Sequence, residues 1–384
     1  MGKKALLAFE DGSYFFGTNF GASGETFGEA VFNTSLVGYQ EVLTDPSYAG
    51  QIVIMTYPEI GIYGINNEDF ESDGIKVNGF VVFRAIKEAF NFRATTTLDE
   101  FLKRYNVIGI EGVDTRAITK KIRSKGTMKA AISTLDLEPS SLVKRVRESA
   151  DIGKLDLVKK VTCQQEAVED FDGAKIVVID CGVKYGIIRE LEQLGAKLIR
   201  LRYDFEVDQI KKIKPDGVLI SNGPGDPKIL KKTVENIRNL LKFEVPLVGI
   251  CLGHQLIALA VGGQTYKMKF GHRGINHPVK DLRTQKVLIT TQNHGYAVDP
   301  KSFGIDLPEE VWKIDFSKSF VGKSLEGFGQ VQITHISLND CTVEGLRLID
   351  KPVFCVQFHP EASPGPHDSK DFFKDFAKLM RGDC

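Results

Sequence analysis

One cysteine stands where an apolar strand runs directly into a helix. Cys251 is the centre of a Gly-x-Cys-x-Gly segment formed with Gly249 and Gly253, and the apolar run 246–250 precedes it. Small residues on both sides permit the sharp turn of a nucleophile elbow. The positive end of the following helix favours the thiolate, which is the nucleophilic form of cysteine. The pattern predicts covalent catalysis by Cys251, while a buried structural cysteine between two chance glycines fits the pentapeptide alone equally well.

A proton shuttle for that thiol stands at the end of another predicted strand. His359 follows the apolar run 352–358, and Glu361 comes two residues later, on the same side of an extended segment. The carboxylate can therefore orient the imidazole and stabilise its charge. The order Cys, His, Glu differs from the usual hydrolase order, but triads are identified by role. An ordinary surface histidine is the alternative for His359, and His254 is interpreted as structural because it would point away from the reacting side.

A loop rich in glycine and proline follows the predicted strand 216–220. It spans residues 221–227 and has glycine at positions 223 and 225. Its bare backbone can approach a ligand, so the N–H groups of Gly225 and Leu252 could both donate to a developing oxyanion. A loop that is tight for packing reasons alone is the alternative.

The predicted secondary structure that positions these residues differs between the two halves of the chain. Residues 1–150 contain short β-rich runs and a few helical patterns, which predicts a mixed α+β N-terminal domain. Residues 151–172 are polar and acidic without clear periodicity, and we expect a linker there. The strands are expected at 5–9, 51–57 and 79–83, and the helices at 97–105, 115–124 and 140–149.

Residues 173–384 repeat the pattern strand, turn, helix. Such alternation predicts an α/β domain with a mostly parallel sheet flanked by helices. In that architecture, ligands bind at the carboxyl ends of the strands. The expected strands are 174–180, 197–201, 216–220 and 246–250, and the expected helices are 184–194 and 228–241.

Composition describes an ordinary globular protein of two or three domains. The 384 residues are 42% hydrophobic and 26% charged, which excludes disordered, collagen-like and coiled-coil classes. The 50 basic and 50 acidic residues leave no net charge that would attract nucleic acid or a membrane. The six cysteines show no paired spacing, so we expect reduced thiols in a cytoplasmic protein. The first apolar run ends at Phe9, too short for a signal peptide, and no segment approaches the length of a membrane span.

Nucleotide and metal motifs are missing from the sequence. The segment 322–324 resembles the end of a phosphate-binding loop, but the earlier glycine that this motif needs is Ser317. No metal-ligand spacing is visible either. We therefore expect no cofactor and no metal on this chain, and any ATP chemistry on a partner.

The segments around Cys251, Gly223 and His359 together resemble the class I, triad-type glutamine amidotransferases. Further segments resemble the small, glutaminase subunits of glutamine-dependent carbamoyl-phosphate synthetases, and this resemblance covers nearly the whole chain. The first half distinguishes that family from the guanylate and anthranilate synthase versions, because stand-alone amidotransferase domains have no counterpart to it. The segments that carry the resemblance are 32–35, 38–41, 44–48, 57–58, 109–116, 271–278 and 292–295.

The resemblance implies that L-glutamine is hydrolysed through a thioester on Cys251, with His359 and Glu361 as the activating pair. Ammonia would pass to a large synthetase subunit that makes carbamoyl phosphate from bicarbonate and ATP, with ATP and Mg²⁺ on that subunit. The product would serve arginine biosynthesis, pyrimidine biosynthesis or both. The implied glutamine contacts are Ser47, Gly223, Gly225, Leu252, Gln255, Asn293, Gly295 and Tyr296, the last in place of the family's usual Phe.

Ser47 lies in the expected N-terminal domain, so the resemblance also implies that the glutamine site borders the domain interface. Two rivals stay open. One is a stand-alone cysteine hydrolase, which would be fully active alone. The other is a catalytically silent interaction subunit, which would form no thioester.

Overall fold

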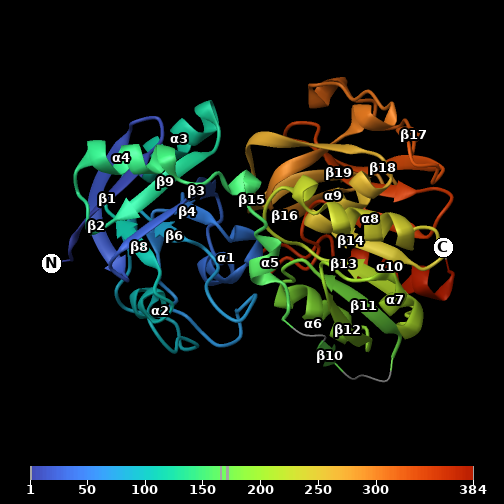
Figure 1. Cartoon of the computed structure of the whole chain (residues 1–384), viewed down its shortest axis with the longest axis horizontal. Coiled ribbons are helices and arrows are strands. Elements are labelled where there is room, and N and C mark those ends of the chain that lie inside the picture. The colour runs from blue at the N-terminus through green and yellow to red at the C-terminus, as the bar shows by residue number, and fades with distance from the viewer. Residues whose placement is uncertain (1, 165–166, 170–172, 384) are drawn as a thin grey trace. The chain divides into compact units, whose positions relative to one another are not determined.

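The computed structural model describes residues 2–164, 167–169 and 173–383 (Figure 1). Two compact units make up the chain, Met1–Leu157 and Val158–Cys384. The linker expected at 151–172 lies partly outside the described residues, namely at 165–166 and 170–172. Its described part is less irregular than the sequence indicates, because it contains η2 (Ile152–Lys154), α5 (Val158–Val161) and β10 (Ala167–Glu169).

The first unit is built around a closed barrel. Its strands follow the order β1-β2-β8-β6-β4-β3-β9. The pairs β8–β6, β6–β4 and β4–β3 are parallel, and the other neighbouring pairs are antiparallel. The strands are β1 (Lys4–Phe9), β2 (Tyr14–Gly21), β3 (Glu25–Asn33), β4 (Gln51–Met55), β6 (Gly79–Val81), β8 (Ile108–Glu111) and β9 (Met128–Ser133), with β5 (Glu59–Ile60) and β7 (Arg84–Ala85) as a separate pair.

Short helices with identifiable caps cover this barrel. Thr97 and Glu100 form a reciprocal capping box at the start of α2, and the Asp114 side chain accepts the Ala117 N–H at the start of α3. The apolar face of α4 packs Leu142 and Val146 against Leu6 of β1. The helices are α1 (Tyr39–Thr44), η1 (Pro46–Tyr48), α2 (Leu98–Arg104), α3 (Thr115–Lys125) and α4 (Pro139–Glu148).

The second unit is a sheet of eleven strands whose centre is parallel. The central order is β12 (Lys197–Arg202), β11 (Lys175–Asp180), β13 (Gly217–Ile220), β14 (Leu247–Ile250) and β20 (Val353–Val356). Antiparallel strands extend it beyond β20: β19 (Val343–Leu348), β18 (Gln330–Ser337), β15 (Gln264–Asp281), β16 (Val287–Asp299) and the short β17 (Val321–Lys323). The predicted fold class is confirmed, with parallel strands flanked by helices.

Strand β11 shows why both faces of the sheet are covered. Its apolar residues alternate between two cores, with Val177 and Ile179 in one and Ile176 and Val178 in the other. The first core receives α7 (Val207–Ile213), α8 (Lys231–Leu240) and α9 (Leu252–Ala260), and the second receives α6 (Tyr185–Gln193) and α10 (Asp371–Arg381). The helix expected from residue 228 begins later, because η3 (Pro227–Ile229) precedes it.

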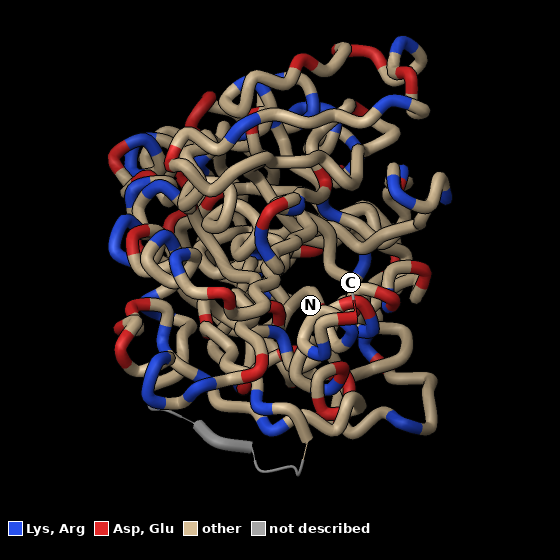
Figure 2. The backbone as a smooth tube through the Cα atoms, turned by 90° about the vertical axis from the view of Figure 1, so that its right-hand side faces the viewer, with Lys and Arg blue, Asp and Glu red and all other residues tan. Residues whose placement is uncertain are grey.

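Charges are well mixed along the backbone. Figure 2 shows Lys and Arg interspersed with Asp and Glu along the chain, and the totals of 50 basic and 50 acidic residues are equal. Within the described ranges, no helix combines the length and the apolar character needed to cross a bilayer.

Candidate active site

Cys251 occupies the turn between β14 and α9. Its backbone angles are φ 54° and ψ −102°, which an L-residue adopts only under strain, and its side chain is buried. A Cβ at Gly253 would lie 2.1 Å from the Ile220 carbonyl oxygen, so only glycine lets α9 approach β13 this closely. The Sγ–H of Cys251 donates to the Asn293 carbonyl across 3.6 Å. The geometry is that of a nucleophile elbow.

His359 and Glu361 follow β20 at the same edge of the parallel sheet. The Nδ1 atom of His359 lies 2.7 Å from Glu361 Oε1, and its backbone N–H donates to the Thr291 carbonyl. Both side chains are fully buried. With Nδ1 held by the carboxylate, Nε2 has no hydrogen-bond partner among the described residues and is the atom available to Cys251.

Charges around this pair shift both pKa values. Burial alone would lower the pKa of His359, but Glu361 and Cys251 outweigh it and raise that pKa to about 10. Burial alone would raise the pKa of Glu361, but Lys184 and His359 hold it at about 2. At neutral pH the pair is therefore an imidazolium and a carboxylate. An imidazolium is the partner that a thiolate nucleophile requires.

Lys184 is a buried member of this group that the sequence analysis missed. Its Nζ donates to Glu361 Oε1 at 2.9 Å and to the carbonyls of Ala362 and Ser363 at 2.8 and 3.1 Å. In the sequence it looks like the first residue of a surface helix. Its position directly after the buried strand β11, at the carboxyl edge that also presents Cys251, is the signal that could have identified it.

Replacing Lys184 with methionine is expected to destabilise the second unit by about 3–5 kcal/mol, because it leaves the buried Glu361 carboxylate without its cation. Urea unfolding followed by circular dichroism measures this loss. Lys370→Met is the matched control, since Lys370 pairs with Glu190 at 2.5 Å but is partly exposed, and should cost about 1 kcal/mol or less. Equal losses for the two variants would contradict a buried charge role for Lys184.

The loop that begins at Ser221 packs against the turn after β11. The Ser221 hydroxyl accepts the Cys181 N–H at 2.9 Å, and the Asn222 side chain accepts the Lys184 N–H at 3.1 Å. Gly225 has φ 90°, a conformation that favours glycine. Leu252 is the first residue of α9, where backbone N–H groups have no acceptor within the helix. Their use as oxyanion donors stays a prediction.

Strand β16 connects to the elbow helix through Gln255. The Nε2 of Gln255 donates to the Tyr296 carbonyl and to Gln357 Oε1, each at 2.9 Å. The first contact uses the backbone of Tyr296 and not its ring, so it is available to Phe or Tyr alike. The structure thus brings Gln255, Asn293 and Tyr296 together beside Cys251.

The remaining predicted glutamine contacts are Gly295, Gly223 and Ser47. Gly295 lies in β16 between Asn293 and Tyr296, and Gly223 lies in the loop after β13. Ser47 belongs to the first unit, in η1, where its N–H donates to Asp45 Oδ1 at 2.9 Å. Glutamine contacts by these residues stay predictions. His254 is fully buried with Nδ1 3.2 Å from Cys355 Sγ, and burial lowers its pKa to about 3, as suits a structural residue.

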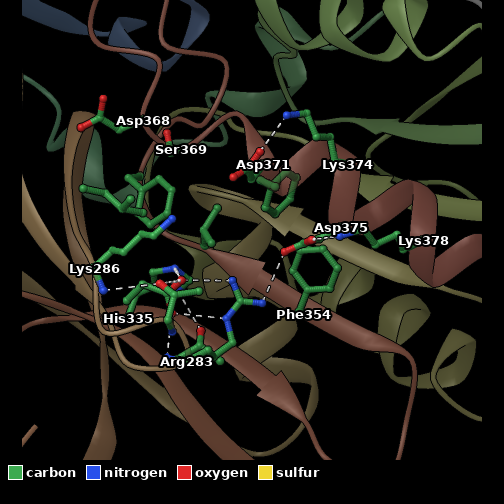
Figure 3. Close-up of a pocket in the computed structure, with 17 residues that line it drawn as sticks. Arg283, Lys286, His335, Phe354, Asp368, Ser369, Asp371, Lys374, Asp375 and Lys378 are labelled. Atoms are coloured by element: carbon green, nitrogen blue, oxygen red, sulfur yellow. Dashed lines mark hydrogen bonds and ion pairs between the residues drawn. The ribbon is translucent and has the colours of Figure 1, made fainter. Parts of the chain in front are cut away.

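A separate cavity of the second unit contains none of these residues. It lies beside α10 and is lined from β16, β18 and β20 as well (Figure 3). Several of its charged side chains pair with one another, as Lys374 does with Asp371 at 2.9 Å and Lys378 with Asp375 at 3.3 Å. We assign it no part in the chemistry of Cys251.

Comparisons with known proteins cover both units. Residues 7–132 match the family model "Carbamoyl-phosphate synthase small chain, CPSase domain", and residues 177–379 match "Glutamine amidotransferase class-I". The "Carbamoyl phosphate synthase small chain" of Thermotoga maritima is 62% identical, with 99% of each chain covered. The protein of the same name from Aquifex aeolicus is 49% identical, with 100% of each chain covered. That of Archaeoglobus fulgidus is 50% identical, with 98% of this chain and 99% of its own covered. The resemblance stated from the sequence motifs is confirmed.

Proposed function

Because the chain belongs to the family of carbamoyl-phosphate synthase small chains, with its class I glutamine amidotransferase domain, we propose that it hydrolyses L-glutamine and delivers the ammonia to a large synthetase subunit. The observation that carries this proposal is the buried pair of His359 and Glu361 at the sheet edge that also presents Cys251. That arrangement supplies a nucleophile and a positioned proton carrier.

The first half of the reaction forms a thioester. The Cys251 sulfur adds to the side-chain amide carbon of glutamine, and the amide oxygen takes up the negative charge. The N–H groups of Gly225 and Leu252 would stabilise this oxyanion, each contributing about 3–4 kcal/mol. His359 then donates its proton to the amide nitrogen, the carbon–nitrogen bond breaks, and ammonia leaves.

The second half regenerates the thiol. His359, now neutral, removes a proton from water as the water oxygen attacks the thioester carbon. The carbon–sulfur bond breaks, the sulfur leaves with the bonding electrons as a thiolate, His359 keeps the proton taken from water, and glutamate departs. Glu361 keeps the imidazole in the tautomer that presents Nε2 to both leaving groups.

The other substrates of carbamoyl phosphate synthesis would bind to the partner subunit. We place the use of bicarbonate and ATP, with Mg²⁺, on the large subunit, because this sequence has no nucleotide-binding motif. The carbamoyl phosphate formed there would enter arginine or pyrimidine biosynthesis in the cytoplasm.

The isolated chain is expected to be a weak glutaminase that its partner activates on the order of a hundredfold. Free ammonia is wasted unless it is handed over, so fast hydrolysis without a partner would consume glutamine for nothing. Misplacing reacting groups by about 1 Å is enough for such a loss of rate, and docking would select the aligned state. The measurement is glutamate release with and without the large subunit, bicarbonate and ATP.

Each outcome of this experiment distinguishes the rivals. Equal rates with and without the partner would favour a stand-alone cysteine hydrolase. No thioester and no glutamate in either case would favour a silent interaction subunit. Replacing glutamine with γ-glutamyl peptides provides a control for substrate preference.

A further inference from the structure

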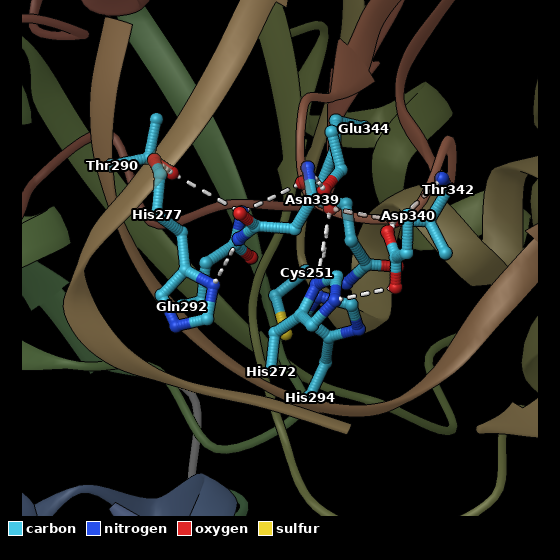
Figure 4. A network of polar contacts seen from close by, with 12 residues as sticks. Cys251, His272, His277, Thr290, Gln292, His294, Asn339, Asp340, Thr342 and Glu344 are labelled. Carbon is cyan, nitrogen blue, oxygen red and sulfur yellow. Dashed lines mark hydrogen bonds and ion pairs between the residues drawn. The ribbon is translucent and has the colours of Figure 1, made fainter. Parts of the chain in front are cut away.

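Three neighbouring strands each contribute one buried side chain to a single cluster. His272 lies on β15, His294 on β16 and Glu344 on β19, and one ligand atom of each lies within 4.8 Å of the others. All three residues are buried. The close-up of this polar network also contains Cys251 (Figure 4).

Distances between the facing atoms are close to those of a metal site. Glu344 Oε1 lies 3.5 Å from His272 Nδ1 and 3.8 Å from His294 Nε2. Ligand atoms about 2.0–2.2 Å from one tetrahedral zinc ion are separated by roughly 3.3–3.6 Å. Neither of the two imidazole nitrogens has a hydrogen-bond partner among the described residues. The two distances to Glu344 would need to shorten by only a few tenths of an ångström, and the two imidazole nitrogens lie within 4.8 Å of each other.

Each of the three side chains is also oriented by a hydrogen bond to its other polar atom, the one that does not face the cluster. His272 Nε2 lies 2.8 Å from Asp340 Oδ2, and His294 Nδ1 lies 2.8 Å from the Tyr296 carbonyl oxygen. Because these acceptors require N–H donors, the facing nitrogen of each ring carries a lone pair whenever that ring is neutral. The Gln292 side chain holds the other oxygen of Glu344 at 2.8 Å. Carboxylate or carbonyl partners of this kind orient metal-binding histidines in proteins.

A proton on His272 is the competing explanation. Burial alone would lower the pKa of His272, but Asp340 and Glu344 raise it to about 9, so a proton on Nδ1 could face Glu344. The Nδ1–H of His294 is held by the Tyr296 carbonyl, so the Nε2 of the neutral ring would still direct a lone pair at a carboxylate oxygen. A buried acceptor without a donor is unfavourable. One cation satisfies all three groups, whereas one proton satisfies only two.

We propose that His272, His294 and Glu344 bind one divalent transition-metal ion. Two imidazoles and one carboxylate are a ligand set that favours Zn²⁺, with a water in the fourth position. The ion would fix β16 against β15 and β19. Asn293, whose carbonyl faces Cys251 Sγ, is the neighbour of His294 in β16, so the ion would stiffen the wall of the elbow site.

The test is metal binding by the full chain, with Cys251→Ala as the parent so that the elbow thiol cannot bind the probe. Zn²⁺ is titrated calorimetrically into metal-free, tag-free protein, and Co²⁺ binding is followed by visible absorption. We expect one equivalent per chain and a cobalt spectrum without a thiolate band. Glu344→Gln and His294→Gln should each weaken Zn²⁺ binding at least about a hundredfold. His277→Gln, a neighbouring histidine with its ring 5.2 Å from His272, should keep the full equivalent.

Thermal unfolding covers the case in which a ligand variant does not fold. Zn²⁺ should raise the midpoint of the parent and of His277→Gln but not that of Glu344→Gln. Asp340→Asn keeps all three ligands and should bind about 10–100-fold more weakly. No binding by the parent, or binding that none of these variants weakens, would overturn the proposal; the first result would leave a protonated His272 as the explanation. Because no readout depends on glutamine turnover, failure here leaves the glutaminase proposal untouched.

Discussion

Replacing Cys251 with alanine is expected to lower glutamine-dependent carbamoyl phosphate synthesis by the assembled enzyme at least about 10⁴-fold. Synthesis from added ammonia should continue at the normal rate. The thiol is the only atom of the proposed group that forms a bond to substrate, so no neighbour can replace it. The loss concerns kcat for glutamine, because ATP and bicarbonate would be used on the other subunit.

The measurement compares carbamoyl phosphate formation from glutamine and from ammonium chloride in the same preparation. Cys163→Ala is the matched control, since Cys163 is a partly buried thiol that lies outside the proposed group and should tolerate the change. A Cys251→Ala enzyme that still used glutamine at a normal rate would disprove the assignment of the nucleophile. Parallel loss of the ammonia-dependent reaction would instead indicate a folding or assembly defect.

Replacing His359 with asparagine should lower glutamine hydrolysis by about 10³–10⁴-fold, and replacing Glu361 with glutamine should lower it clearly less. His359→Asn removes the proton carrier itself. In Glu361→Gln, the Nζ of Lys184 would still donate a hydrogen bond to the atom at the Oε1 position. That atom would therefore be the amide oxygen and not the amide nitrogen, and it would still accept from His359 Nδ1. The imidazole therefore keeps its tautomer and loses only the charge beside it.

Single-turnover measurement of thioester formation and breakdown ranks these two variants. A histidine NMR titration adds an independent reading: the pKa of His359, about 10 beside the carboxylate, should fall toward its ordinary value in Glu361→Gln. His359 would then lose its proton at lower pH than in the parent. A larger rate loss for Glu361→Gln than for His359→Asn would count against the two roles.

Sequence reasoning predicted the parts of the site that are local in the chain. The elbow is specified by a strand, two glycines and a helix within a few residues, and His359 and Glu361 are two positions apart in an extended segment. Apolar runs predicted the central strands because a strand buried on both faces needs little polar sequence. These features depend on neighbours in sequence, which a single sequence displays.

Contacts between distant segments were not predictable in the same way. Lys184 meets Glu361 only because β11 and β20 end at one edge of the sheet. The hairpin of β15 and β16 is polar and interrupted by register shifts, so it lacks the alternation by which strands are recognised. The first unit closes into a barrel through pairing of β1 with β9, and nothing local indicates that closure.

The cluster of His272, His294 and Glu344 was also not predictable from the sequence. Positions 272, 294 and 344 have no ligand spacing of the kind that sequence motifs use, so the sequence indicated no metal site. Only the pairing of β15 with β16, and the approach of β19, brings the three side chains into one place.

The backbone angles of Cys251 also set catalysis against stability. A non-glycine residue held at φ 54° and ψ −102° costs about 1–3 kcal/mol, while a whole domain is stable by only about 5–15 kcal/mol. Glycine would relieve that strain and would remove the nucleophile. Part of the stability of this unit is therefore given up to hold the sulfur where it can react.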